Sequence, residues 1–175
     1  MRRARTWAWT EEFKEFASGS SGHLYRSACL LTSGDTHSAE DLVQETLGRM
    51  YGMWGRISRI DNPAGYAHTV LVRTFLSQQR RRSAGERPLG ELPDTPERHC
   101  EVDVAALRVT LLQALGELAP KDRAVVVLRY WEDRSIEETA EAMGASPAAV
   151  RTRSTRALTK LRALLGASLP EFAAL

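Results

Sequence analysis

The fold is decided by the stretch at residues 119–165, APKDRAVVVLRYWEDRSIEETAEAMGASPAAVRTRSTRALTKLRALL. Pro120 fits the first position of a helix, where its missing N–H is not needed for a hydrogen bond. Apolar residues then recur at helical spacing and predict an inward face. They are Ala124, Val125, Val127, Leu128 and Trp131. The stretch therefore opens with an amphipathic helix.

Two more helices are predicted by the capping residues that follow. Ser135 fits a helix N-cap, and Glu138 three residues later completes a capping box. Gly144 stands where a helix C-terminus favours a left-handed residue. Ser146 caps the next helix and Pro147 occupies its first turn. A short helix, a tight turn with glycine and a second helix together make a helix-turn-helix.

The last helix of the stretch is basic, with no acidic residue between Ala145 and Leu165. Its apolar positions predict a face packed on the two preceding helices. They are Val150, Ala157, Leu158, Leu161 and Leu165. The outward positions carry Arg151, Thr152, Thr155 and Arg156. Arginine and threonine side chains on one helix face suit a DNA major groove. The alternative is a solvated basic face on an ordinary helical bundle.

Composition limits the classes of protein that remain. The chain has 175 residues and a net charge of +2, so the basic helix must be balanced by acidic segments. No apolar run approaches the length of a membrane span, and we expect no membrane insertion. Cys29 and Cys100 are too few for a disulfide framework, which favours a reducing cytoplasm. We expect no metal ion and no cofactor.

The N-terminal half is expected to form four helices. Their ranges are 10–17, 23–32, 38–54 and 63–82. The run Ser18–Gly22 should break the first helix from the second. The third helix begins with an acidic and polar patch, which includes Glu40, Asp41, Gln44 and Glu45. Acidic residues in a first turn are also stabilised by the helix dipole, so this patch is either a binding surface or an ordinary helix N-terminus.

The fourth of these helices carries a stripe suited to single-stranded nucleic acid. The stripe contains Tyr66, Thr69, Arg73, Ser77 and Arg80. Bases stack on aromatic and guanidinium planes, and cations track phosphates. Arginine near a helix C-terminus is favourable in any protein, which is the alternative interpretation.

Residues 83–103 are rich in proline, glycine and acidic residues and predict an extended linker. We therefore expect an all-α protein of two small domains joined by a flexible linker. The N-terminal domain should span residues 10–82 with four helices. The C-terminal domain should span residues 104–166, with four helices that include the helix-turn-helix.

Three segments resemble the extracytoplasmic-function (ECF) type of bacterial sigma factors, in the order and spacing of that family. LGELAPKDRAVVVLRYWEDRSIEETAEAMGASPAAVRTRSTRALTKLRALL at 115–165 resembles the region that binds the upstream (−35) promoter element. AEDLVQETLGRMY at 39–51 resembles the polymerase-binding helix. NPAGYAHTVLVRTFLSQQRRR at 62–82 resembles the promoter-melting helix.

The resemblance implies a role for residues on each segment. Asp41 and Gln44, with Glu45 beside them, would dock on the largest subunit of core RNA polymerase. The residues implied to hold flipped bases of the downstream (−10) element are Arg59, Asp61, Asn62, Tyr66, Thr69, Arg73 and Ser77, with Arg80 on the phosphates. The residues implied to read or position the upstream element are Arg151, Thr152, Arg153, Thr155 and Arg156. The chain departs from the family pattern at His68, Arg73 and Ser154.

The resemblance implies a protein that binds core RNA polymerase and double- and single-stranded promoter DNA, and melts the start region without catalysing a reaction. An anti-sigma protein is an expected further partner. A stand-alone DNA-binding regulator is the competing class, but it would need a ligand pocket or a dimerising helix pair in the N-terminal half. An enzyme is the second alternative. The sequence offers no nucleophile–base pair or metal-ligand spacing, and the histidines at 23, 37, 68 and 99 share no motif.

Overall fold

A computed structural model of the chain describes residues 2–85 and 102–166, with side chains at 9–84 and 108–166. Every regular element of these residues is a helix, so the all-α prediction is confirmed. The N-terminal half contains α1 (Arg2–Leu31), α2 (Thr36–Ile57) and α3 (Pro63–Gly85). The C-terminal half contains α4 (Val102–Gly116), α5 (Pro120–Val126), the π-helical turn η1 (Val127–Trp131), α6 (Ile136–Met143) and α7 (Pro147–Leu165).

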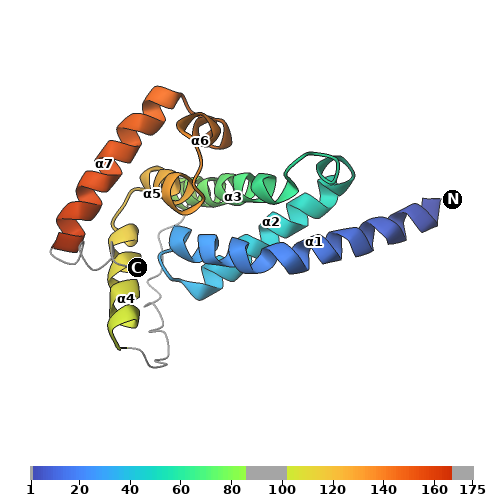
Figure 1. Cartoon of the computed structure of the whole chain (residues 1–175), viewed down its shortest axis with the longest axis horizontal. Helices are drawn as coiled ribbons and strands as arrows, with labels where there is room; N and C mark the ends of the chain where they lie inside the picture. Colours follow the sequence, from blue (N-terminus) through green and yellow to red (C-terminus); the bar gives the residue numbers. More distant parts are fainter. Residues whose placement is uncertain (1, 86–101, 167–175) are drawn as a thin grey trace.

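The N-terminal half has three helices, and the prediction of four was wrong. The run Ser18–Gly22 does not interrupt the helix, because α1 continues through it to Leu31. Helix α1 lies along α2 and buries Leu24 and Ala28 completely (Figure 1). Glycine in a helix costs only about 1 kcal/mol relative to alanine. Tertiary packing of the turns that follow therefore overrides the local signal.

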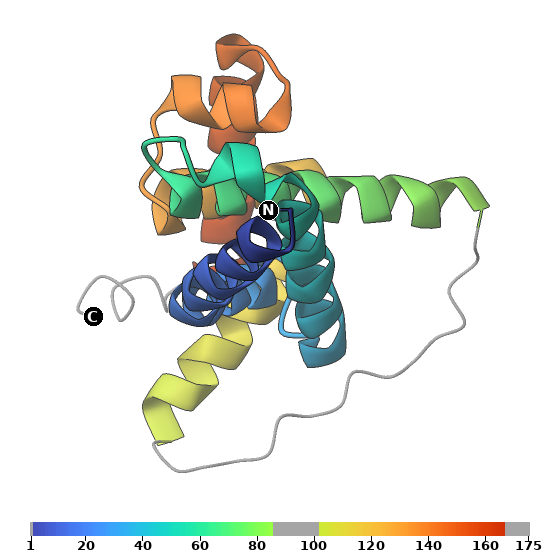
Figure 2. The ribbon, with the colours of Figure 1, turned by 90° about the vertical axis from the view of Figure 1, so that its right-hand side faces the viewer.

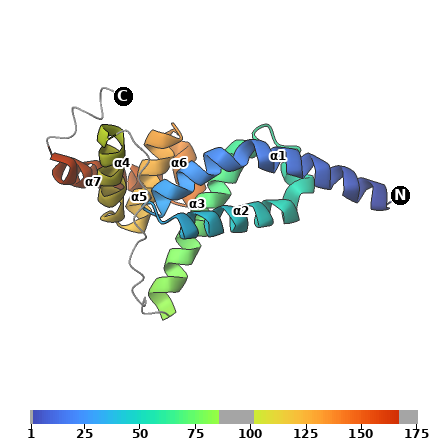
Figure 3. The same cartoon turned by 90° about the horizontal axis from the view of Figure 1, so that it is seen from below.

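The core of this half is formed by apolar residues of α2 and α3. Leu42, Met50 and Trp54 of α2 are buried, as are Leu71 and Phe75 of α3. Beyond this core the C-terminal end of α3 projects away from the other helices (Figures 2 and 3). The basic end of the stripe on α3 is consequently exposed.

The helix-turn-helix of the C-terminal half is confirmed in detail. Ser135 accepts a hydrogen bond from the Glu138 backbone N–H, and the Glu138 carboxylate accepts one from the Ser135 N–H. Gly144 ends α6 in the left-handed region, with φ of 59°. Ser146 accepts from the Ala149 N–H at the start of α7. The capping box fixes the start of α6, and Gly144 and Ser146 fix the turn between α6 and α7 that the sequence predicts.

Helix α7 buries Val150, Ala157, Leu161 and Leu165 as expected. Leu158, expected with them, is only half-buried. Ser154 is also buried, and its hydroxyl has no hydrogen-bond partner. Trp131, expected to face inward, remains 46% exposed at the end of η1.

The two halves pack directly on one another. Ala124, Val127, Leu128 and Ala142 of the C-terminal half belong to the same buried cluster as the core of α1–α3. Figure 1 shows α5 lying against α3, with α6 above it. Arg123 of α5 adds polar contacts, because its guanidinium donates at 2.7 Å to the Leu31 carbonyl of α1. The structure therefore has a closed arrangement of the halves.

The linker predicted at 83–103 falls largely outside the described residues, although 83–85 continue α3 and 102–103 begin α4. The domain limits at residues 10–82 and 104–166 stay predictions. Among the described helices, none has the combination of length and apolar character that would let it cross a membrane.

Candidate polymerase and nucleic-acid surfaces

The acidic face of α2 separates into an exposed pair and a tethered residue. Asp41 and Gln44 are exposed near the start of the helix. Glu45 is half-buried and accepts hydrogen bonds from Gln78 of α3 at 2.7 Å and from Arg49 at 2.6 Å. The hydrogen bond from Gln78, followed by that from Arg49, lowers the pKa of the Glu45 carboxyl. Glu45 thus joins α2 to α3, and Asp41 and Gln44 are left open to a partner.

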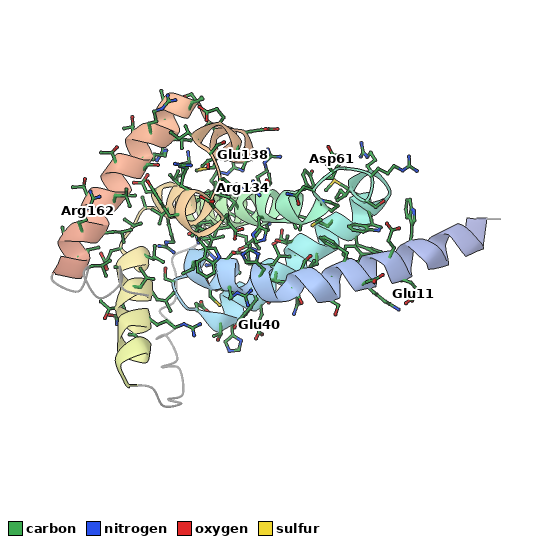
Figure 4. All side chains as sticks on the ribbon, viewed as in Figure 1. Glu11, Glu40, Asp61, Arg134, Glu138 and Arg162 are labelled. Carbon is green, nitrogen blue, oxygen red and sulfur yellow. The ribbon has the colours of Figure 1, made fainter. Side chains whose placement is uncertain are left out.

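The loop between α2 and α3 presents Arg59, Asp61 and Asn62 at the surface, with Asp61 at the outer edge (Figure 4). Asn62 also has a structural role, because its side-chain oxygen accepts from the Gly65 N–H at 2.7 Å. A Cβ atom at Gly65 would lie 2.6 Å from the Asn62 side chain. The close approach of these two residues fixes the loop at the start of α3.

The stripe on α3 is formed as the sequence predicts, but its centre is hydrogen-bonded to the C-terminal half, although Arg73 itself remains exposed. Arg73 donates from Nε to the Ala142 carbonyl at 2.8 Å and from Nη2 to the Glu141 carbonyl at 2.9 Å. Both carbonyls lie in the last turn of α6, where unpaired acceptors and the helix dipole favour a cation. The guanidinium of Arg73 therefore links α3 to the C-terminus of α6.

In a second contact between the halves, the donor lies in the C-terminal half and the acceptors lie on α3. Arg134, between η1 and α6, donates to the Thr69 hydroxyl at 2.8 Å and to the Gly65 carbonyl. Figure 4 shows Arg134 and Glu138 where the C-terminal half meets α3. Tyr66 and Ser77 on the same stripe are half-buried, whereas Arg80 is exposed. Two residues that the sequence assigned to DNA, Thr69 and Arg73, are thus bonded to the other half of the chain.

A cavity of about 610 Å³ lies between the halves. Its lining contains four carboxylates against two guanidinium groups. They are Glu132, Asp133, Glu138 and Glu141, and Arg73 and Arg134. This acidic excess disfavours a nucleic-acid phosphate in the closed arrangement.

A polar cluster at the edge of this cavity was missed by sequence reasoning. His23 of α1 and His68 of α3 meet Glu132, which follows η1. The Glu132 Oε1 atom lies 3.0 Å from His68 Nδ1 and 3.5 Å from His23 Nε2. The three positions are far apart in the chain and share no motif, so only the packing of the halves brings them together.

Glu132 is ionised at neutral pH in this cluster. Burial by itself raises the pKa of the carboxyl, but the neighbouring His68 and the Ser27 hydroxyl reverse the effect and lower it. Ser27 donates to Glu132 Oε1, and the Trp131 indole N–H donates to the Ser27 hydroxyl at 3.1 Å. The carboxylate is therefore held in place by neighbours from both halves.

The basic face of α7 is also divided. Arg151, Thr152 and Thr155 are exposed. Arg156 bonds the Asp122 carboxylate of α5 through two nitrogens, at 2.7 and 2.8 Å, and Arg153 bonds it at 2.9 Å. Burial tends to raise the pKa of Asp122, and the two arginines lower it below its ordinary value. Three of the five predicted upstream-element residues thus face solvent, and two are turned toward Asp122.

A helix-turn-helix with a basic outward face, joined to a bundle that carries an acidic patch and a basic stripe, is typical of a transcription protein. Residues 21–85 match the family Sigma-70 region 2, and residues 108–161 match Sigma-70, region 4. The two matches cover most of the chain. The chain therefore belongs to the sigma-70 family, and among its members to the ECF type.

Its relatives agree with this assignment. The RNA polymerase sigma-E factor of Streptomyces coelicolor is 38% identical over 156 residues, which cover 86% of this chain and 84% of the relative. The ECF RNA polymerase sigma factor SigL of Mycobacterium tuberculosis is 32% identical over 146 residues, which cover 81% and 82%. The protein is an ECF sigma factor, which binds core RNA polymerase and promoter DNA and directs transcription initiation without catalysing a reaction.

The fold is found in solved structures as well. The sigma factor RpoE in complex with the anti-sigma factor NepR from Bartonella quintana superimposes with a TM-score of 0.70 at 24% identity, and covers 90% of this chain and 98% of that one. CnrH in complex with the cytosolic domain of CnrY gives a TM-score of 0.62 at 21% identity, covering 90% of each. These two likenesses concern the fold.

Proposed function

We propose that three surfaces of this sigma factor divide the work of initiation. Asp41 and Gln44 on α2 dock on core polymerase. The stripe on α3, with the loop at residues 59–62, holds unstacked bases of the downstream element. The exposed face of α7 reads the upstream element. No surface performs a chemical step, since binding energy alone compensates the few kcal/mol that each extruded base costs.

The observation that carries the proposal is the geometry of α7. Its apolar side is buried on the rest of the C-terminal half, and capped turns fix its position. Arg151, Thr152 and Thr155 therefore project together into solvent. Arginine can bond guanine with two hydrogen bonds, and threonine contacts bases or a thymine methyl group. A rigid helix with these side chains fits a major groove.

Arg153 and Arg156 have a more restricted part in this proposal. Both guanidinium groups are bonded to Asp122, which is buried at the start of α5. Arg156 is nevertheless largely exposed, so it can exchange Asp122 for a base at little desolvation cost. Arg153 is better placed to support the helix, and contact with a DNA phosphate would require a change of its rotamer.

The closed arrangement is not the one that melts DNA. Thr69 and Arg73 are bonded to the C-terminal half, and the acidic cavity lies over them. Bases can bond Thr69 and Arg73 only after α6 and Arg134 leave α3. We propose that binding to core polymerase separates the halves and frees the stripe, and that the chain acts in the cytoplasm, where polymerase is.

An anti-sigma protein fits the same scheme. RpoE and CnrH were both solved with proteins bound to them, NepR and the cytosolic domain of CnrY. A comparable partner of this chain would oppose the separation of the halves. It would thereby keep the factor from polymerase without any change in its nucleic-acid surfaces.

A reconstituted transcription assay tests the division of labour. The promoter is first obtained by sequencing transcript start sites after overexpression. Arg151→Ala should lower promoter use by a factor that corresponds to about 1–3 kcal/mol and relax the preference for the upstream element. Arg162→Ala, which removes an exposed arginine further along α7, is the matched control and should change promoter use little.

The same assay separates docking from reading. Asp41→Ala should weaken binding to core polymerase, whereas Glu12→Ala on the exposed surface of α1 should leave it unchanged. An Arg151→Ala loss of equal size on every upstream sequence contradicts base reading by α7. Undiminished polymerase affinity in Asp41→Ala contradicts the docking assignment.

A further inference from the structure

The cluster of His23, His68 and Glu132 has the features of a metal site. We propose that it binds one Zn²⁺ ion, through His23 Nε2, His68 Nδ1 and a Glu132 oxygen, with water in the fourth position. The ligand atoms all lie within 4.8 Å of one another. This inference departs from the expectation that the chain holds no metal.

The distances in the cluster fit a tetrahedral ion. Zinc lies about 2.0–2.2 Å from histidine nitrogen and carboxylate oxygen, which places neighbouring ligand atoms about 3.3 Å apart. The two measured separations from Glu132 Oε1 are 3.0 Å to His68 and 3.5 Å to His23. The two histidine nitrogens lie within 4.8 Å of each other, so the ion is admitted between the three atoms by adjustment of their side chains.

The His68 nitrogen lacks a better partner in the structure. His68 is 5% exposed, and its Nδ1 makes no aligned hydrogen bond despite the nearby carboxylate. A buried nitrogen without a hydrogen bond costs about 1–3 kcal/mol. Coordination would satisfy this atom, and it would also neutralise the buried charge of Glu132.

The surroundings of the cluster resemble the outer shell of known metal sites. Ser27 donates to the Glu132 carboxylate, and Trp131 in turn donates to Ser27. Such hydrogen bonds orient a ligating carboxylate and commonly affect metal affinity by 10–100-fold. Two nitrogen ligands favour zinc over magnesium or calcium, which prefer oxygen.

An ion can reach the site. The His23 side chain is 47% exposed, and both histidines line the cavity between the halves. The acidic excess of that lining attracts a divalent cation, although Arg134 beside the cluster reduces the attraction. Because His23 and His68 belong to one half and Glu132 to the other, the bound ion would bridge them. On the proposed function above, it would therefore favour the closed arrangement.

Calorimetric titration of the metal-free full chain with Zn²⁺ tests the site. We expect one ion per chain. His23→Ala and Glu132→Gln should each lower the affinity at least tenfold, and Ser27→Ala about tenfold through the outer shell. His37→Ala, an exposed histidine on α2, is the matched control and should leave the affinity unchanged. His23→Ala keeps the test valid if a variant of the buried His68 fails to fold.

Cobalt provides a second readout. Co²⁺ bound to the full chain should show visible absorption typical of a tetrahedral ion, and X-ray absorption should find nitrogen and oxygen neighbours without sulfur. The proposal is overturned by absence of binding, by equal affinity in wild type and His23→Ala, or by loss of binding in Cys100→Ser. None of these measurements requires polymerase, so their failure is distinct from failure of the proposed function.

Discussion

At the scale of single residues, Asp122 fastens α7 to α5. Its carboxylate is buried, and it accepts hydrogen bonds from both Arg153 and Arg156. Hydrogen bonds to charged groups contribute more than neutral ones, about 1.5–3 kcal/mol. Because the network joins the first turn of α5 to the middle of α7, it helps to set the position of the surface that we propose reads the upstream element.

Asp122→Asn should lower the free energy of unfolding by about 2 kcal/mol at neutral pH, since one charge of the network is removed. The folded-state pKa of Asp122 lies below the unfolded value of about 3.9. Its contribution is therefore complete above the unfolded pKa and is lost as pH falls through the folded pKa. The difference between wild type and variant, measured by urea unfolding, should narrow as pH falls below about 4.

Glu137→Gln is the control for this prediction. Glu137 of α6 is exposed, and its carboxylate lies 3.5 Å from the guanidinium of Arg151 on α7. A surface pair of this kind contributes between about 0 and 1 kcal/mol. A difference for Asp122→Asn no larger than that for Glu137→Gln, or one that does not depend on pH, contradicts the role of Asp122.

At the scale of elements, α6 depends on its caps. It has only eight residues, and isolated helices of that length are marginal in water. Ser135→Ala removes one half of the capping box and should lower the free energy of unfolding by about 1 kcal/mol. Thr159→Ala, which removes an exposed hydroxyl within α7, should change it by less than about 0.5 kcal/mol. Equal midpoints of urea unfolding for the two variants would refute the importance of the cap.

Local signals of this type explain which elements could be predicted from the sequence. Pro120, Ser135, Gly144 and Ser146 act on the turn in which they lie, and all four mark the ends of helices as expected. The run Ser18–Gly22 led to the wrong prediction of a helix break. Its preference for a break is weak, and the packing of α1 on α2 and α3 overrides it. The length of α1 could not be read without that packing.

The π-helical turn η1 shows the same limit. Nothing in the sequence VLRYW signals the change from α5 to a wider turn. The turn nevertheless directs Trp131 toward Ser27 and brings Glu132 to the two histidines. Such wide turns are frequent at functional positions. The outward positions of Arg151, Thr152 and Thr155 were predictable from helical spacing, whereas this cluster required the tertiary structure.

At the scale of the whole molecule, the contact between the halves decides whether Thr69 and Arg73 on α3 are available to another partner. Three arginines, Arg73, Arg123 and Arg134, bond backbone carbonyls across the contact. Val127 and Leu128 add buried apolar area that opening would expose to water. These partners lie far apart in the chain, so sequence patterns gave no sign of a closed arrangement. Separation is therefore favourable only when another surface, such as polymerase, replaces the lost contacts.

Opening can be measured through a thiol placed inside the contact. Val127→Cys, in a chain with Cys29→Ala and Cys100→Ser, should react with a thiol reagent only when the halves separate, because Val127 is 2% exposed. Arg134→Ala removes the hydrogen bonds to Thr69 and Gly65, which together contribute about 2 kcal/mol. The reaction should then accelerate by roughly thirtyfold, the factor that this free energy corresponds to. Arg162→Ala, outside the contact, should leave the rate unchanged, and a rate equal in both variants would show that Arg134 does not hold the halves together.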